Sequence, residues 1–301
     1  MQKILVERIT SFTGHKDCIY TIQPFQGGVF YSAGGDGMVV EWTVEEPDKG
    51  EVFAKLTHSV YALALDFEKQ HLWIGENFAG IHVVTLDSKK EVASAAVSKA
   101  AIFDIQLFEN KAFVATGEGV IIVLDAKDLT TLARIPAAQK SARAIAVNPV
   151  TKEFAVGFSD NFIRIFSTET FALKKEFEAH KNSVFTVRFS PDYQYLLSGS
   201  RDAHLKIWNG KTYELEKSIV AHMFTINHIS FDTSGENFAT CSMDKSIKLW
   251  RTKDFSLLKV IDKARHAGHG TSINKLAWLN PYKLLACSDD RAISFWQINN
   301  L

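Results

Sequence analysis

The side chains best suited to chemistry in this chain of 301 residues are its ten histidines and the aspartates that recur at a fixed distance from them. Imidazole and carboxylate groups bind zinc and act as general acids and bases. His266 and His269 form a close histidine pair, but they lie in a predicted loop and not on a helix that would aim both rings at one ion. The pair therefore does not predict a metal site.

Five aspartates occupy equivalent places in successive repeats, so they are not pairs of acids assembled for general acid–base work. They are Asp36, Asp160, Asp202, Asp244 and Asp290. Two glycine-containing stretches, at residues 34–37 and 198–200, resemble pieces of phosphate-binding loops, but no helix follows either of them. We therefore expect no catalytic residue, no bound cofactor and no metal.

The clearest repeat reads LLSGSRDAHLKIW at residues 196–208 and FATCSMDKSIKLW at residues 238–250, and similar runs end at Trp42 and Trp296. In each run an Asp precedes the Trp by six residues. The equivalent positions along the whole chain are Trp42, Val84, Leu124, Phe166, Trp208, Trp250 and Trp296. Their spacings of 42, 40, 42, 42, 42 and 46 residues divide the chain into seven similar units.

Each unit consists of short runs rich in Val, Ile, Phe and Tyr, and no long stretch keeps the apolar period of a helix. Such units predict an all-β fold, a seven-bladed β-propeller that forms one domain over residues 1–301. The last unit ends after its third strand, so we expect residues 2–12 to supply the fourth and close the ring. The expected blades are 14–56, 57–97, 98–136, 137–178, 179–220, 221–262, and 263–301 together with 1–13.

The repeats resemble those of the WD40 family over essentially the whole chain. The resemblance rests on Gly-His or Ala-His before the inner strand, on FSPD at residues 189–192 and on SGSRD with KIW in unit five. It implies a buried tetrad in each blade, made by this His, a Ser or Thr in the second strand, the Asp of the next turn and the Trp of the third strand. Three tetrads are complete: His15, Ser32, Asp36 and Trp42; His180, Ser198, Asp202 and Trp208; and His222, Thr240, Asp244 and Trp250.

The remaining units depart from this pattern. Unit seven has Ala286 where the hydroxyl belongs, and unit four keeps only Asp160. Unit two retains His58 alone, and unit three has Glu118 in place of the Asp. We expect units two to four to have replaced much of their tetrads with apolar contacts.

Composition narrows the classes of partner and the cellular compartment. Lys and Arg balance Asp and Glu at 34 each, so no strong positive field is available for nucleic acid. No apolar run approaches the roughly 18 residues of a membrane span, and no membrane association is expected. The scattered Cys18, Cys241 and Cys287 predict free thiols, which favours the cytoplasm, with the nucleus as the alternative.

The WD40 resemblance also implies the docking face, where the loops that precede the inner strands meet the turns with the tetrad Asp. Positions three and five residues after the repeat His, and the residue before the Asp, are expected to be exposed there. The predicted partner-binding residues are Tyr20, Tyr61, Leu63, Phe103, Arg143, Phe185, Arg201, Asn227, Met243 and Asn274. Aromatic residues, Met and Arg are enriched at interfaces, so we expect a protein or peptide partner.

Two functions stay open at this point. The favoured one is a non-catalytic scaffold for protein–protein interaction, in which the residues above contact the partner. The alternative is a propeller enzyme, or a protein that binds a small ligand or metal, with its site in the central channel. Phe103 and Phe185 also allow a purely structural interpretation, in which both rings pack between blades.

Overall fold

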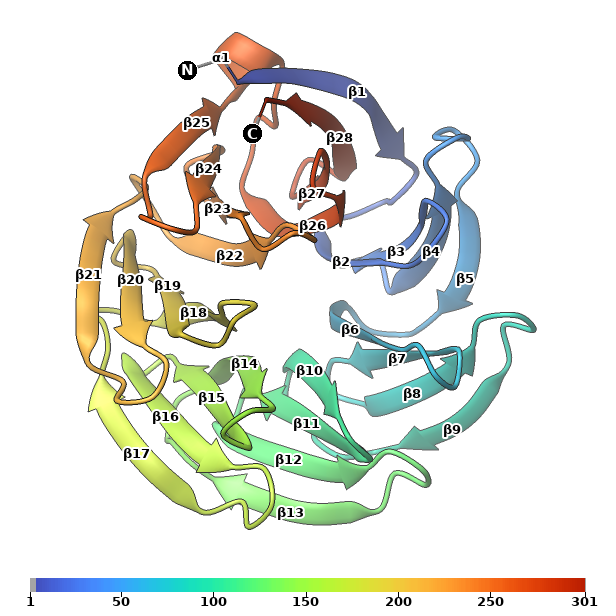
Figure 1. Cartoon of the computed structure of the whole chain (residues 1–301). Coiled ribbons are helices and arrows are strands. Elements are labelled where there is room, and N and C mark those ends of the chain that lie inside the picture. The colour runs from blue at the N-terminus through green and yellow to red at the C-terminus, as the bar shows by residue number, and fades with distance from the viewer. Residues whose placement is uncertain (1–3, 301) are drawn as a thin grey trace.

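A computed structural model of the chain, described for residues 4–300, shows seven four-stranded antiparallel sheets arranged in a ring around a central channel (Figure 1). In each sheet the first strand borders the channel and the fourth lies at the rim. Blade one comprises β2 (Ile19–Pro24), β3 (Val29–Gly34), β4 (Met38–Thr43) and β5 (Glu51–Lys55). Blade two comprises β6 (Val60–Asp66), β7 (His71–Glu76), β8 (Gly80–Thr85) and β9 (Glu91–Ala95).

The next four blades repeat this order without interruption. Blade three comprises β10 (Ile102–Phe108), β11 (Lys111–Thr116), β12 (Val120–Asp125) and β13 (Thr131–Pro136). Blade four comprises β14 (Ala142–Asn148), β15 (Glu153–Phe158), β16 (Phe162–Ser167) and β17 (Leu173–Glu178). Blade five comprises β18 (Val184–Phe189), β19 (Tyr195–Ser200), β20 (His204–Asn209) and β21 (Leu215–Val220). Blade six comprises β22 (Ile226–Phe231), β23 (Asn237–Ser242), β24 (Ile247–Arg251) and β25 (Leu257–Ile261).

Blade seven is built from both ends of the chain, as the sequence predicts. Its strands are β26 (Ile273–Asn280), β27 (Lys283–Ser288), β28 (Ala292–Asn299) and β1 (Leu5–Thr13). β1 pairs antiparallel with β28, and the predicted strand residues 2 and 3 lie outside the described part of the chain. This pairing joins the two ends and leaves no open edge in the ring (Figure 1).

The one α-helix of the described residues occupies the extra length before blade seven. α1 (Lys263–His266) is a single turn, and the side chain of Asp262 caps it by accepting a hydrogen bond from the Arg265 amide at 2.9 Å. The Arg8 guanidinium on β1 donates to the carbonyl of Ala267, which follows the helix, at 2.5 Å. The insertion therefore supports the closing strand. No helix within residues 4–300 is long and apolar enough to span a bilayer.

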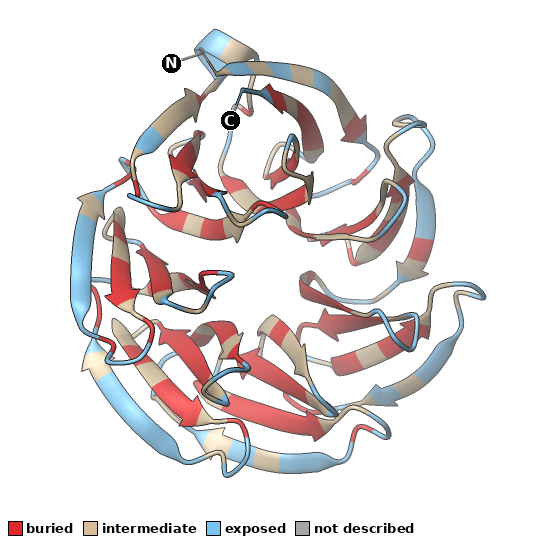
Figure 2. Cartoon of the chain, viewed as in Figure 1, coloured by how far each residue is buried: buried red, intermediate tan, exposed pale blue. Residues whose placement is uncertain are grey.

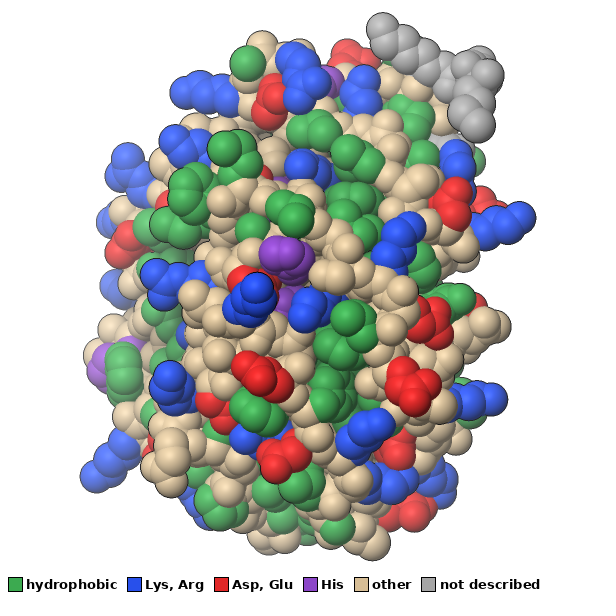
Figure 3. Space-filling view, turned by 90° about the vertical axis from the view of Figure 1, so that its left-hand side faces the viewer, with side chains coloured by type: hydrophobic (Ala, Val, Ile, Leu, Met, Phe, Trp, Pro, Cys, Tyr) green, Lys and Arg blue, Asp and Glu red, His purple; other side chains and the backbone are tan. Residues whose placement is uncertain are grey.

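The core consists of seven hydrophobic clusters, each of which lies between two neighbouring blades. The cluster between blades seven and one, for example, contains Phe12, Trp42 and Phe295. Burial is concentrated in the inner three strands, whereas outer strands such as β17 and β21 are largely exposed (Figure 2). Seen from the side of these outer strands, acidic and basic side chains are interspersed over the surface (Figure 3).

Candidate functional site

Three blades contain the polar networks that the WD40 resemblance implies. In blade five, His180 Nδ1 lies 3.1 Å from Asp202, His180 Nε2 lies 2.7 Å from Ser198 Oγ, and Trp208 Nε1 donates to the same oxygen at 2.8 Å. Blade one joins His15, Ser32, Asp36 and Trp42 in the same way, and blade six joins His222, Thr240, Asp244 and Trp250. Each Asp also accepts the backbone amide of the residue after the repeat His and one amide of its own turn, so the networks fix the loops of one face.

Blade seven has the same network with a relocated hydroxyl. Ser294 on β28 contacts His269 Nε2 at 2.7 Å and accepts a hydrogen bond from Trp296 Nε1 at 2.7 Å. Ser294 is the cross-strand partner of Ala286, the position that lacks the hydroxyl. The oxygen therefore reaches the network from the neighbouring strand, and sequence alignment of the repeats did not reveal it.

In blades two to four, buried apolar residues replace the hydroxyl and the Trp, as the sequence predicts, but other polar pairs occur at this level. The replacements are Ile74, Val84, Val114, Leu124, Val156 and Phe166. In blade two, Glu76 accepts hydrogen bonds from the amides of Thr57 and His58 and lies 2.9 Å from His82 Nε2. Ser98 donates to Glu118 at 3.0 Å in blade three, and Arg164 pairs with Asp160 at 2.9 Å in blade four. Carboxylates thus recur around the ring even where the His and Trp are lost.

A β-bulge interrupts the inner strand of every blade at the same place. In β18, Val184 pairs with Ser200 and Thr186 pairs with Gly199, so Phe185 has no partner on the second strand. The seven residues skipped in this way are Tyr20, Tyr61, Phe103, Arg143, Phe185, Asn227 and Asn274. A bulge re-aims a side chain out of the sheet, and all seven side chains line one pocket at the mouth of the channel.

Five of these residues form a continuous stack, which we call the aromatic arc: Tyr20, Tyr61, Phe103, Arg143 and Phe185. Tyr20 meets Tyr61 edge to face, with centroids 4.6 Å apart, and Tyr61 stacks on Phe103 at 5.5 Å. The Arg143 guanidinium lies between two rings, 4.1 Å from Phe103 and 4.2 Å from Phe185. Each contact joins one blade to the next. All five residues nevertheless remain partly exposed, so they are available to a ligand as well.

Asparagines continue the ring of contacts beyond the arc. Asn227 Nδ2 donates to the carbonyl of Ile273 at 2.8 Å, and Asn274 Nδ2 donates to the carbonyl of Ile19 at 2.9 Å. These bonds link blade six to blade seven and blade seven to blade one. The bulged positions therefore couple blades and face the pocket at the same time.

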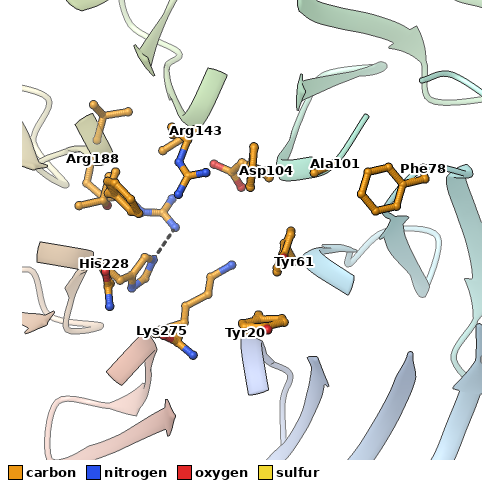
Figure 4. Close-up of a pocket in the computed structure, with 16 residues that line it drawn as sticks. Tyr20, Tyr61, Phe78, Ala101, Asp104, Arg143, Arg188, His228 and Lys275 are labelled. Atoms are coloured by element: carbon orange, nitrogen blue, oxygen red, sulfur yellow. Dashed lines mark hydrogen bonds between the residues drawn. The ribbon is translucent and has the colours of Figure 1, made fainter. Parts of the chain in front are cut away.

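The pocket encloses about 440 Å³, and basic side chains gather on one side of it (Figure 4). Arg188, His228 and Lys275 extend into it from blades five, six and seven, and we call these three residues the pocket floor. Arg188 Nη2 lies 3.4 Å from His228 Nε2, and Lys275 Nζ donates to Thr21 Oγ1 at 3.0 Å. Asp104 is the one acidic side chain among the residues that line the pocket.

Burial shifts the acid–base behaviour of these groups. It lowers the pKa of Arg143 to about 10, which leaves the guanidinium charged at neutral pH. Burial likewise lowers the pKa of Lys275, and Asp104 opposes this shift. Burial first, and the Arg188 charge second, hold the pKa of His228 well below its ordinary value, so this imidazole is neutral at pH 7.

Leu63 is a correction to the predicted set. It was expected to be exposed on the docking face, but only 3% of its surface is exposed, and it packs in the cluster between blades one and two. The loop from His58 to the inner strand is two residues shorter than in blade one or five, so counting five residues from the His overshoots the bulge. Tyr61 is the residue that occupies the bulged position in blade two.

The other predicted residues lie in the loops around the pocket, together with some residues that were not predicted. Arg201 and Met243 are exposed in the turns next to the tetrad aspartates, outside the pocket. Phe78 lines the pocket from the turn of blade two. Met223 and Phe224, which follow His222, are 82% and 58% exposed and lie beside Met243, whose amide donates to the carbonyl of Thr225. Met223 and Phe224 directly follow the repeat histidine, and this position in the sequence could have indicated that they lie on the docking face.

Other chemistry is not assembled in the described part of the chain. No group of three or more His, Cys, Asp or Glu side chains within residues 4–300 could hold a metal ion. The thiols of Cys18, Cys241 and Cys287 are all free. Burial raises the pKa of Cys287 to about 12, which keeps this thiol protonated at neutral pH.

Comparison with known proteins supports the repeat assignment. The family model for the WD domain, G-beta repeat, known as WD40, matches residues 171–209, 213–251 and 262–297. The first two matches each begin with the outer strand of one blade, β17 or β21, and continue through the inner three strands of the next, blade five or blade six. The third match covers α1 and the inner three strands of blade seven. No curated protein sequence matches the chain.

Among solved structures, the crystal structure of the WD40 beta propeller domain of Doa1 is similar, with a TM-score of 0.86 over 97% of each chain. Its sequence identity is 16%, so the likeness concerns the fold. In all, 1833 chains of solved structures match, and a fold this widespread does not by itself identify a partner.

Proposed function

Because this chain is a seven-bladed β-propeller with WD40 repeats, we propose that it is a non-catalytic scaffold that binds a protein or peptide at the mouth of its channel. WD40 propellers commonly serve protein interaction, and the observation that carries the proposal here is the aromatic arc. The partly exposed side chains around the pocket include Tyr, Phe and Arg, and Tyr and Arg are among the residue types that dominate binding energy at interfaces. The exposed Met223, Phe224 and Met243 extend the apolar surface on the same face.

The enzymatic alternative has less support in the pocket. Its volume of about 440 Å³ would suit a small ligand. Its one carboxylate, however, is engaged, because Asp104 accepts hydrogen bonds from the amides of Ile105 at 2.9 Å and Ile145 at 2.8 Å. His228, the one imidazole of the lining, is largely buried, and its Nδ1 accepts a hydrogen bond from the Leu276 amide at 3.3 Å. Neither group is placed as a free general base.

The free thiols also favour the cytoplasm as the proposed location of the protein.

Affinity purification with quantitative mass spectrometry tests the scaffold and its face together. We expect the double variant Phe185→Ala, Arg201→Ala to lose most of the partner that the wild-type protein recovers, by at least about 10-fold if one side chain is a hot spot. The matched control is Tyr282→Ala, Lys211→Ala, which removes an aromatic ring and a cation from turns at the opposite end of the strands. Equal recovery by both double variants would refute binding at the channel mouth.

A further inference from the structure

We propose that the pocket floor recognises an anionic side-chain group, a carboxylate or a phosphate, that a bound peptide inserts past the aromatic arc. This inference rests on the proposed function and specifies the chemistry of the partner. It starts from the charges that line the pocket. Arg143, Arg188 and Lys275 are cationic, and Asp104 alone is acidic. Within residues 4–300, none of the three cations forms a salt bridge.

Asp104 offsets only part of this charge, through its electrostatic effect on Lys275. One of its carboxylate oxygens accepts hydrogen bonds from the Ile105 amide and from Gln106 Nε2, and the other accepts from the Ile145 amide. The carboxylate is therefore turned toward the backbone of its own and the next blade. The pocket retains a net positive charge that a bound anion would balance.

The arc itself selects against a cationic ligand. Aromatic faces that could surround an ammonium group are already occupied, because the Arg143 guanidinium lies between Phe103 and Phe185. Contact with a ring on each side restrains the guanidinium. Arg143 makes no hydrogen bond to any described residue through its guanidinium N–H groups. A fixed planar fork with free donors is suited to a carboxylate or phosphate.

A peptide side chain that passes the aromatic arc would reach the pocket floor with its terminal group. Arg188 and Lys275 line this pocket and also two smaller cavities of about 240 and 230 Å³ that continue the channel. Both residues thus lie where the three spaces adjoin. Burying cations without a carboxylate partner costs stability, and burial lowers the pKa of Lys275 accordingly. Such unpaired charge in a cavity is typical of a binding site.

The test uses random 12-residue peptides displayed on phage and selected on the full-length protein. We expect the selected peptides to be enriched in Asp and Glu. In synthetic copies, Glu→Gln at the enriched position should weaken binding by about 10-fold or more, the loss expected for one charge-assisted hydrogen bond. Replacement of that Glu by phosphoserine should preserve or strengthen binding. Isothermal titration with inorganic phosphate alone measures whether a free anion suffices.

Variants of the floor connect the preference to these residues. Arg188→Met, Lys275→Met should weaken acidic peptides by about 10-fold or more, whereas Lys211→Met, Lys253→Met should not change binding. Each double variant removes two positive charges, but the control lysines lie in turns at the opposite end of the strands. Circular dichroism and melting check folding, and we expect no loss of stability from Lys275→Met because it removes a costly buried charge. If that variant fails to fold, Lys275→Arg should retain the acidic preference.

The possible results separate this inference from the proposed function. Peptides that bind without acidic enrichment, or that are indifferent to the floor variant yet sensitive to Phe185→Ala, Arg201→Ala, would overturn the anion site and leave the scaffold intact. Tight binding of inorganic phosphate without any peptide binding would overturn insertion of a peptide side chain. If neither a peptide nor a cellular partner depends on the channel mouth, the proposed function itself fails.

Discussion

At the scale of single residues, blade seven shows that the buried network requires an oxygen at one point in space and not a particular residue in the sequence. Ser294 and Ala286 face each other across β27 and β28, so a hydroxyl on either can reach the same His and Trp. Ser294 is fully buried, and its oxygen joins His269 Nε2 to Trp296 Nε1. Removal of this oxygen would leave Trp296 Nε1 without its partner and His269 Nε2 with only the Ala286 carbonyl, 3.1 Å away.

We therefore predict that Ser294→Ala destabilises the protein by about 1–3 kcal/mol, the usual cost of a buried polar group that loses its partner. The free energy of unfolding in urea, followed by circular dichroism, measures the effect. The double variant Ala286→Ser, Ser294→Ala supplies the hydroxyl from β27, where Ser198 carries it in blade five. It should recover most of the lost stability. A single variant as stable as wild type would show that the relocated hydroxyl has no energetic role.

At the scale of elements, β1 closes the ring through one face of the strand. Phe12 is fully buried and meets Phe30 and Trp42 of blade one, with centroids 4.9 and 5.6 Å away. Ile9, three residues earlier on the same strand, is 47% exposed. β1 therefore joins blades seven and one mainly through Phe12, in addition to its backbone pairing with β28.

The comparison of two substitutions on β1 tests this division of roles. Phe12→Ala should cost about 3–5 kcal/mol, the range for truncation of a buried phenylalanine, because no other side chain can fill the space at the junction. Ile9→Ala should cost much less, since its side chain is already largely in water. Urea unfolding of both variants measures the difference. Similar losses would mean that the backbone pairing of β1, and not the junction core, closes the ring.

The inner strands show how far sequence predicts such elements. Repeat spacing predicted seven blades and the closure by β1, because both depend on regular apolar patterning. Counting from the repeat position reached the bulged residue in every blade except blade two, where a loop shorter by two residues placed Leu63 in the core. The stack around Arg143 was not predictable, because it depends on how side chains of separate blades orient at the bulges.

At the scale of the whole molecule, the ring is chemically uneven. Blades five, six, seven and one contain His–Asp pairs that are largely buried, at 2.9–3.1 Å between Nδ1 and the nearer carboxylate oxygen. In blade three, by contrast, the Arg134–Glu118 pair is about half exposed on both sides. Ion pairs exposed to this degree contribute little. Blades five, six, seven and one should therefore respond to acid differently from blades two to four.

Burial lowers the pKa of His15, His180 and His222, although an Asp beside each one opposes the shift. Burial would raise the pKa of Asp202, but hydrogen bonds from His180 and from the amides of Lys181 and His204 outweigh it and hold this pKa below its usual value. Both the lowered His pKa values and the lowered Asp202 pKa make the folded protein less stable relative to the unfolded chain as the pH falls. As the pH falls below about 6.5, the unfolded chain binds protons at these histidines before the folded chain does, which favours unfolding. The Asp contribution is lost at still lower pH.

Hydrogen exchange measured at pH 7 and pH 5, and expressed as protection factors, tests the uneven response. The histidines of residues 4–300 whose pKa falls are His15, His180, His222, His228 and His266, all in blades five to seven and one or in the segment before blade seven. Protection in the inner strands of blades one, five and six should therefore fall more between pH 7 and pH 5 than in blades two to four, which serve as the internal control. An equal fall around the ring would mean that the propeller opens as one cooperative unit and that the buried His–Asp pairs do not set local stability.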